Sequence, residues 1–259
     1  KNINKISKNK LKILDRTKLI LDIFNDHAKT NEAKKQIELA TLQYMLPRLT
    51  GLWTHLERQM GGIGTRGGPG EKQIEIDKRI IRRNITKLKR NLKNIDTQRK
   101  TQRKNRHDIF KISLVGYTNA GKSTLMKELS GFNALIKNQL FATLDTTTRI
   151  TVFKKNYKAL LSDTVGFLSN LPHDLIASFK STLEEINEAD LIIKVIDISH
   201  SNIKHHIQTI DQTLDMLNIK DKTSLLVFNK IDRINDTQIF KKINTEYSNP
   251  IMISSIKSL

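Results

Sequence analysis

A glycine-bounded stretch early in the second half of the chain contains residue types that suit phosphate chemistry. Residues 116–123 read Gly-Tyr-Thr-Asn-Ala-Gly-Lys-Ser. The glycines let the backbone curl so that successive N–H groups point at phosphate oxygens, and a following helix adds its positive end. We expect Lys122 to supply charge to the β- and γ-phosphates and Ser123 to bind Mg²⁺ through its hydroxyl. The candidate phosphate-binding residues are Gly116, Tyr117, Thr118, Asn119, Ala120, Gly121, Lys122, Ser123 and Thr124.

A second stretch, Asn-Lys-Ile-Asp, lies about a hundred residues further on and suits recognition of guanine. Asp232 can accept hydrogen bonds from guanine N1–H and N2–H₂. Adenine lacks that pair of donors and would leave a buried carboxylate unpaired, which costs about 1–3 kcal/mol or more. Lys230 can cover the base, and Asn229 can brace the phosphate-binding loop. Ser254 and Ser255, after the last apolar run, are candidates to offer a backbone N–H to guanine O6.

Two further positions suggest a metal ion and a switch. Asp163 follows an apolar run and can hold Mg²⁺ through water. The N–H of Gly166, three residues later, can report on the γ-phosphate, which makes 164–180 a candidate switch. A second Mg²⁺ ligand is needed from the polar loop before it, and Thr143 is the favoured residue. Its rivals are Thr146, Thr147 and Thr148.

The residue after the switch glycine bears on the rate of hydrolysis. Small GTPases often have glutamine there to orient the attacking water, whereas this chain has Phe167, which cannot do so. We therefore expect slow intrinsic hydrolysis that a partner, a cation or another residue stimulates. Asn119 is placed to bind a monovalent cation such as K⁺ near the phosphates, or else simply braces its loop. The candidate catalytic residues are Lys122, Thr143, Gly166 and Asn119.

Composition points to an anionic partner. The chain has 259 residues with 45 Lys+Arg against 26 Asp+Glu, a net charge of +19. Such an excess favours nucleic acid or an acidic membrane face. The chain has no cysteine, which excludes disulfides and thiolate metal sites. No apolar run approaches the roughly 20 residues that a membrane-spanning helix needs.

Much of the charge falls on one predicted helical hairpin. Spacing of apolar residues predicts a helix over 30–46 and a long amphipathic helix over 71–106. Between them, 61–70 contains six glycines and a proline, which predicts a loop. The stretch 71–107 has 14 Lys/Arg against 4 Asp/Glu, about half of the excess charge. An apolar stripe with coiled-coil-like spacing suits an antiparallel pair of these helices.

The second half of the chain alternates strands with helices, which predicts an α/β fold with a mostly parallel sheet covered on both faces. We expect strands at 110–115, 150–153, 157–161, 191–196, 224–228 and 251–253, and helices at 124–129, 174–185 and 202–217. The apolar runs near the N-terminus are of strand or buried-helix type. The predicted domains are 1–28, the remnant of a truncated α/β domain, then 29–107, the basic hairpin, and 108–259, the nucleotide domain.

These motifs together resemble the HflX family of translational GTPases. The resemblance rests on the runs Trp53–Arg79, Val115–Thr124, Phe141–Asp145 and Asp163–Phe167. It implies a P-loop GTPase fold that binds GTP, GDP and Mg²⁺, with Thr143 as the magnesium threonine. It also implies a cytoplasmic protein that binds the large (50S) ribosomal subunit, splits or rescues stalled or idle ribosomes, and inserts its Gly-rich loop toward rRNA.

The residues themselves agree with RNA as the partner, because a flexible loop between cationic helices can approach an RNA backbone closely. An alternative is a module for rRNA binding or ribosome assembly. Nucleotide binding would gate this module, and hydrolysis would be incidental. A membrane anchor is disfavoured because the long helix is poor in Trp and Phe. We expect a monomer. The candidate RNA contacts are Arg66, Arg79, Arg82, Arg83, Lys87 and Arg90.

Overall fold

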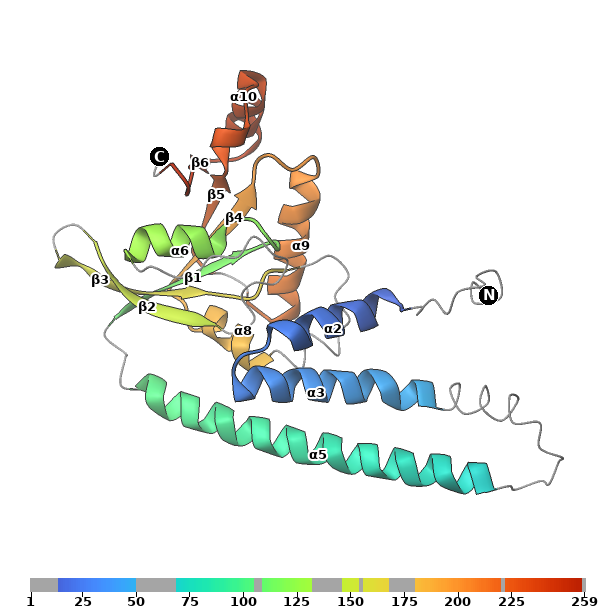
Figure 1. Ribbon diagram of the computed structural model, residues 1–259. Helices are drawn as coiled ribbons and strands as arrows, with labels where there is room; N and C mark the ends of the chain where they lie inside the picture. Colours follow the sequence, from blue (N-terminus) through green and yellow to red (C-terminus); the bar gives the residue numbers. More distant parts are fainter. Residues whose placement is uncertain are drawn as a thin grey trace, which may run out of the picture.

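The structure is a computed structural model that describes residues 14–49, 69–104, 109–131, 146–153, 156–167, 180–219 and 222–257. It consists of a helical arm and an α/β domain, and the arm extends along one side of that domain (Figure 1). No helix in these ranges is both long and apolar enough to cross a membrane.

The arm begins with two capped helices. Helix α2 (Arg16–His27) starts where the Asp15 side chain accepts the Lys18 N–H. Helix α3 (Asn31–Met45) starts where the Thr30 hydroxyl accepts the Ala33 N–H, and a short 3₁₀ turn, η1 (Leu46–Arg48), follows it. Such caps satisfy backbone donors that a helix leaves without a partner. The predicted helix at 30–46 is confirmed, and the apolar run before residue 28 is a helix rather than a strand.

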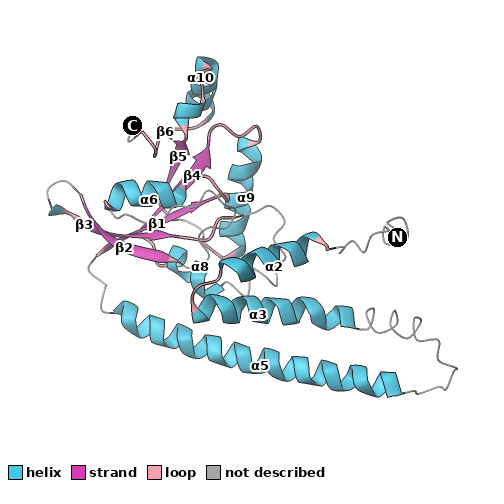
Figure 2. Cartoon of the chain, viewed as in Figure 1, coloured by secondary structure: helices cyan, strands magenta, loops and turns pink. Residues whose placement is uncertain are grey.

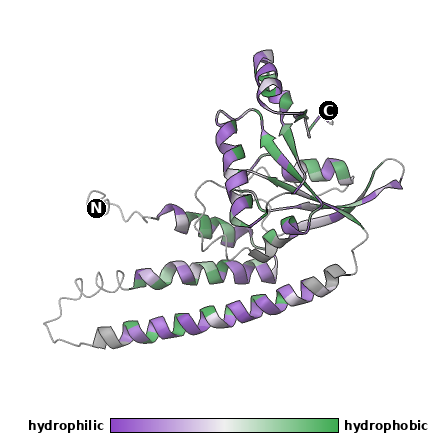
Figure 3. Cartoon of the chain, turned by 180° about the vertical axis from the view of Figure 1, so that it is seen from behind, coloured by the Kyte–Doolittle hydropathy of each residue, from purple (hydrophilic) through white to green (hydrophobic). Residues whose placement is uncertain are grey.

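Helix α5 (Pro69–Lys104) pairs with α3 to form the hairpin of the arm. It lies beside α3 in the opposite direction, and its surface is mostly hydrophilic with an interrupted apolar stripe (Figures 1 and 3). Leu88 on that stripe is buried. An ion pair of 2.7 Å joins Arg99 Nη2 on α5 to Glu32 Oε2 on α3. The predicted hairpin pairing is therefore present.

The predicted boundary of the Gly-rich loop was wrong at its end. Pro69 and Gly70 belong to α5, whereas 61–68 lies outside the described residues. Proline suits the first turn of a helix because its fixed φ matches the helix and its missing N–H is not needed there. The first turn of α5 therefore includes Pro69 and Gly70, two residues whose types also favour a loop.

The α/β domain contains a sheet with strand order β2-β3-β1-β4-β5-β6. Only β2 runs antiparallel to its neighbour among the described strands (Figure 2). The predicted mostly parallel sheet is confirmed. Its strands are β1 (Phe110–Gly116), β2 (Thr147–Val152), β3 (Lys158–Asp163), β4 (Leu191–Asp197), β5 (Ser224–Asn229) and β6 (Ile251–Met252), and its helices are α6 (Lys122–Ser130), α8 (Lys180–Asn187), α9 (Ile203–Met216) and α10 (Thr237–Glu246), with the 3₁₀ turn η3 (Ile231–Arg233).

Two clusters of buried apolar residues cover the two faces of this sheet. The smaller one packs α6 against Leu114, Leu161 and Val195. The larger one contains residues of α8, α9 and α10, and it continues into α2 and α3 of the arm. Val165 and Phe167, directly after β3, belong to this larger cluster. The two residues that flank Gly166, the predicted sensor of the γ-phosphate, are therefore part of the same core as the arm.

Helix α10 was not predicted. It has ten residues, and Asp236 caps its N-terminus by accepting the Gln238 N–H. Ile243 on it is buried, and Ile239 and Phe240 pack partly buried against the same core cluster. The cap residue was the available signal for this helix.

Candidate nucleotide-binding site

The phosphate-binding loop joins the end of β1 to the start of α6, and its glycines are required by close packing. A Cβ on Gly116 would lie 2.4 Å from the Val195 carbonyl oxygen of the neighbouring strand. Gly121 has φ +95°, and a Cβ there would lie 2.2 Å from Asn229 Nδ2. No side chain caps the N-terminus of α6. Backbone N–H groups at that end of the helix therefore suit an anion.

Lys122 is buried at the centre of this loop. Its Nζ donates to the carbonyl oxygens of Gly116, at 3.2 Å, and Tyr117, at 3.1 Å. Burial lowers the lysine pKa from 10.5 to about 8, although the charge of Asp163 opposes the shift. A Cβ on Gly166 would approach Lys122 Nζ to 3.1 Å, so the switch glycine lies directly beside the ammonium group. The structure thus brings together the predicted phosphate lysine and the predicted sensor of the γ-phosphate.

Two predicted magnesium residues meet beside Lys122. The Ser123 hydroxyl donates to Asp163 Oδ2 at 2.6 Å, from the start of α6 to the end of β3. A hydroxyl and a carboxylate are the oxygen donors that Mg²⁺ prefers, and the ion usually keeps several waters. The residues present therefore fit this ion. In the described part of the chain, no group of three or more His, Cys, Asp or Glu residues forms a metal cluster.

The predicted threonine ligand, Thr143, lies outside the described residues. Its rivals lie on or next to β2. Thr148 is engaged at the sheet, where its hydroxyl donates to Glu185 Oε2 at 3.0 Å and contacts the Ser162 hydroxyl. This engagement makes Thr148 a poor rival.

The segment after β3 lies along the phosphate-binding loop. The Phe167 N–H donates to the Gly116 carbonyl, and the Thr118 N–H donates to the Phe167 carbonyl, each at 3.0 Å. The Phe167 side chain is only 2% exposed and points into the larger core cluster. Its backbone therefore touches the loop, while its ring is withdrawn from solvent.

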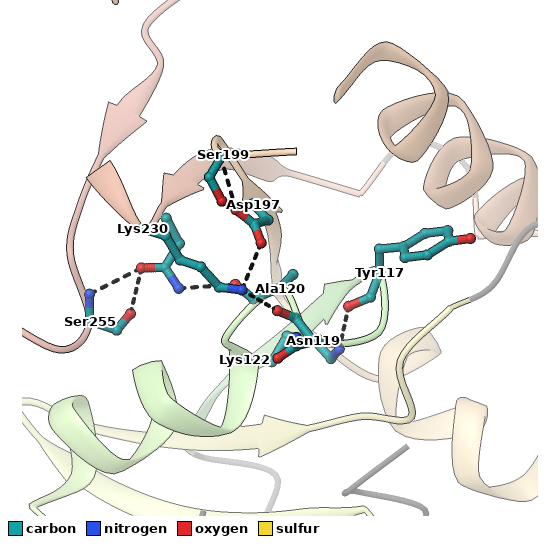
Figure 4. A network of polar contacts seen from close by, with 9 residues as sticks. Tyr117, Asn119, Ala120, Lys122, Asp197, Ser199, Lys230 and Ser255 are labelled. Carbon is teal, nitrogen blue, oxygen red and sulfur yellow. Dashed lines mark hydrogen bonds and ion pairs between the residues drawn. The ribbon is translucent and has the colours of Figure 1, made fainter. Parts of the chain in front are cut away.

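The motif predicted to read guanine is hydrogen-bonded to the phosphate-binding loop, as Figure 4 shows for Lys230. Asn229 Nδ2 donates to the Ala120 carbonyl at 3.0 Å, which is the brace expected from the sequence. Asn229 Oδ1 accepts the Ser255 N–H at 3.0 Å and the Ser255 hydroxyl at 2.9 Å. The Ser254 hydroxyl donates to Asp232 Oδ1 at 2.5 Å.

The two serines therefore have a role that the sequence did not suggest. The N–H of Ser255, predicted as a donor to guanine O6, donates to Asn229 in this structure. The serines orient the side chains of Asn229 and Asp232, because each places a hydrogen bond on one of these two residues. Their direct contact with a base stays a prediction.

Lys230 links the reader to the loop through a residue that sequence reasoning missed. Its Nζ donates to the Asn119 carbonyl and pairs with Asp197 Oδ2, both at 2.6 Å (Figure 4). Burial raises the Asp197 pKa, but hydrogen bonds from Lys230 and Ser199 outweigh it and leave that pKa below its ordinary value. Asp197 ends β4, at the edge of the sheet where parallel strands place ligand-binding residues. That position, at the end of a predicted strand, is the feature from which Asp197 could have been identified in the sequence.

The predicted RNA contacts lie apart from this site. Those on α5 are all exposed, and Arg66 lies outside the described residues. Part of this face borders a surface hollow. The described residues that line the hollow are Glu75, Ile76, Lys78, Arg79, Arg82, Arg83 and Thr86.

The fold and the site together define a P-loop GTPase domain joined to a basic helical arm. Two family descriptions match the chain along these lines. Residues 27–106 match "GTP-binding GTPase Middle Region", and residues 111–230 match "50S ribosome-binding GTPase".

Curated relatives give the family a name. The GTPase HflX of Flavobacterium psychrophilum is 55% identical over 232 residues, which are 90% of this chain and 55% of the relative. The GTPase HflX of Escherichia coli is 45% identical over 227 residues, which are 87% of this chain and 53% of the relative. The chain belongs to the HflX family of GTPases. It spans about half the length of the curated relatives it matches.

Solved structures agree with this assignment. A GTP-binding protein of the archaeon Sulfolobus solfataricus in complex with GDP is 29% identical with a TM-score of 0.56, covering 95% of this chain and 68% of that chain. A structure described as SsGBP with GDP is 30% identical with a TM-score of 0.57, covering 95% of this chain and 69% of that chain.

Proposed function

We propose that this chain binds guanine nucleotides where the phosphate-binding loop meets the Asn229–Asp232 motif, and that it hydrolyses GTP to GDP and phosphate. One observation carries this proposal. Asn229 and Lys230 donate directly to the Ala120 and Asn119 carbonyls of the loop. A base reader and a phosphate loop that share hydrogen bonds hold one ligand across both parts.

The roles within the site follow from the contacts. Lys122 would exchange its two carbonyl partners in part for phosphate oxygens, and its charge would oppose the charge that develops during transfer. Ser123 and Asp163, with Thr143, would hold Mg²⁺, which neutralises phosphate charge when bound. The N–H of Gly166 would contact the γ-phosphate. The GTP-binding protein of Sulfolobus solfataricus and SsGBP, each solved with GDP, support this ligand class.

Hydrolysis by the isolated chain is proposed to be slow. The Phe167 side chain is buried in the core and has no group that could orient water. Stimulation must therefore come from a partner or a cation. Asn119, whose side chain is exposed and whose backbone has φ 62°, is the proposed K⁺ ligand.

The proposed partner is the large ribosomal subunit, bound through rRNA. The family description of residues 111–230 names 50S binding, and the exposed cations of α5 suit a phosphate backbone. Because Val165 and Phe167 share a core with α2 and α3, the nucleotide state could bias the arm. Splitting or rescue of stalled ribosomes is the finer form of this proposal.

Base recognition offers the direct test. We expect Asp232→Asn to weaken GTP binding about 100-fold and to favour xanthosine triphosphate, because an amide can donate to the xanthine 2-oxygen. Titration of both nucleotides against the native chain and the variant measures this exchange. Equal affinity of the two proteins for GTP would show that Asp232 does not read the base.

A further inference from the structure

Tyr117 of the phosphate-binding loop stacks on a histidine from a different element. The rings of Tyr117 and His206, in the first turns of α9, have centroids 3.9 Å apart and planes 10° apart. His206 is only 5% exposed, and the His200 ring lies 4.1 Å from it on another side. No motif or spacing along the chain connects these two residues.

Tyr117 is the point at which several parts of the site meet. Its carbonyl accepts Lys122 Nζ at 3.1 Å and the Ala120 N–H at 3.2 Å. Its backbone also forms a β-bridge with Phe167 of the switch segment. A displacement of Tyr117 would therefore move the lysine, the turn of the loop and the switch together. Its ring stacks on His206 of α9.

We propose that His206 is a positioning residue for the phosphate-binding loop, acting through its stack on Tyr117. The proposal rests on the proposed nucleotide site. His206 Nδ1 is buried and has no hydrogen-bond partner among the described residues. A buried polar atom left in this way is costly. The ring therefore serves as an aromatic surface, and the stack contributes stabilisation beyond the area that it buries.

Burial and two neighbouring imidazoles keep the His206 ring neutral at neutral pH, so the position of the loop should respond to acid. Burial lowers the His206 pKa from 6.5 to about 4, and His200 and His205 lower it further while Asp197 opposes them. His200 Nδ1 accepts the Asn202 N–H, which fixes that neighbouring ring. Protonation of His206 would place a charge between Tyr117 and two other imidazoles. The charged and titratable groups facing it are thus His200, His205 and Asp197, with the hydroxyl of Tyr117 on the partner ring.

The chain offers matched variants for a test. His206→Ala removes the stack, whereas His206→Phe keeps an aromatic ring but cannot take up a proton. His205→Ala changes the adjacent histidine, which is exposed. The measurement is the Kd of a fluorescent GDP analogue, from neutral pH to below the His206 pKa of about 4, with thermal unfolding followed in parallel.

We expect His206→Ala to raise the Kd about three- to ten-fold at neutral pH, and His206→Phe to restore it. As the pH falls through about 4, where His206 takes up its proton, the unmodified chain should lose affinity more steeply than His206→Phe. Titration of the nucleotide's own phosphates is common to both proteins and cancels in this comparison. His205→Ala should match the unmodified chain at neutral pH.

Three results would overturn the inference: a normal Kd in His206→Ala, a Kd in His206→Phe as weak as in His206→Ala, or equal acid limbs for His206→Phe and the unmodified chain. If His206→Ala does not fold, the loss of affinity at low pH, compared between His206→Phe and the unmodified chain, decides the question alone. A failure of the unmodified chain to bind the analogue at neutral pH would instead refute the proposed function, and the inference with it.

Discussion

The nucleotide corner and helix α5 use positive charge in opposite ways. At the corner, Lys122 and Lys230 are 6% and 7% exposed, and each ammonium group makes two short contacts. On α5, by contrast, Arg79, Arg82 and Arg83 are exposed along one helix. The first arrangement fixes single atoms, whereas the second spreads charge over a surface.

This difference predicts two kinds of behaviour. A buried cation with fixed partners recognises a ligand by geometry, and its removal is expensive because the partners stay buried. Exposed cations contribute small, additive and salt-dependent increments to the binding of a polyanion. One substitution should therefore disable the corner, whereas several are needed to disable α5.

The largest effect is expected at Lys122. Lys122→Ala should weaken GTP and GDP binding about 100-fold or more, because a buried charged partner of the phosphates is lost. Lys127→Ala, on the same helix α6, is the control and should bind normally. Calorimetry or a fluorescent analogue measures both, and binding of large-subunit rRNA at low salt, in the absence of nucleotide, should stay unchanged in each variant. Loss of RNA binding in Lys122→Ala would contradict the separation of the two regions.

Lys122 also predicts a pH dependence. In the free protein its pKa is about 8, whereas bound phosphates favour the charged lysine. Below about pH 8 the lysine is already charged and affinity is full. Above that pH binding must take up a proton, so affinity should fall up to about ten-fold per pH unit. Comparing calorimetric enthalpies in buffers of different ionisation heat would detect the proton, and an affinity that is flat across this range would contradict the assignment.

A smaller effect is expected at Asp197. Asp197→Asn removes the charge that holds Lys230, and we expect guanine nucleotides to bind about ten-fold more weakly. Asp211→Asn is the matched control, since Asp211 Oδ1 pairs with Lys194 Nζ at 2.7 Å in the same domain but nearer the surface. A double-mutant cycle with Lys230→Ala sharpens the test. If the two changes were additive, Asp197 would not act through Lys230.

The smallest effect per residue is expected on α5. Arg82→Ala and Arg83→Ala should each weaken binding to large-subunit rRNA a few-fold and lower the slope of log affinity against log salt by about one. Arg82→Lys and Arg83→Lys keep the charge and serve as controls. Filter binding over a range of salt concentrations measures the slope. Nucleotide affinity should not change, and an unchanged salt slope would remove these residues from the interface.

The parts of the fold that the sequence predicted are those with local causes. Apolar runs that end at Gly116 and Asp163 indicated the strands, and the spacing of apolar residues indicated α3. The glycines of the phosphate-binding loop also have a local cause. At each of them, a backbone or side-chain atom lies too close to leave room for a Cβ.

The contacts that were missed depend on which strand ends become neighbours. Asp197 meets Lys230 because β4 pairs with β5 in a register that places Asp197 opposite Asn229. Tyr117 meets His206 because α9 packs beside β1. Neither pairing can be read from spacing along the chain, since it follows from the strand order of the sheet. The loop boundary at Pro69 failed for a simpler reason, because proline suits both a loop and the first turn of a helix.

The central claim is that one molecule couples a guanine-nucleotide site to a basic arm that binds the large ribosomal subunit. Its most direct test is GTP turnover with and without purified large subunits, in potassium and in sodium, for the unmodified chain and for Arg82→Ala/Arg83→Ala. We predict strong stimulation by the subunits, greater in potassium, and a weaker response of the variant at moderate salt. Tight GTP binding with no stimulation at low salt would contradict the account.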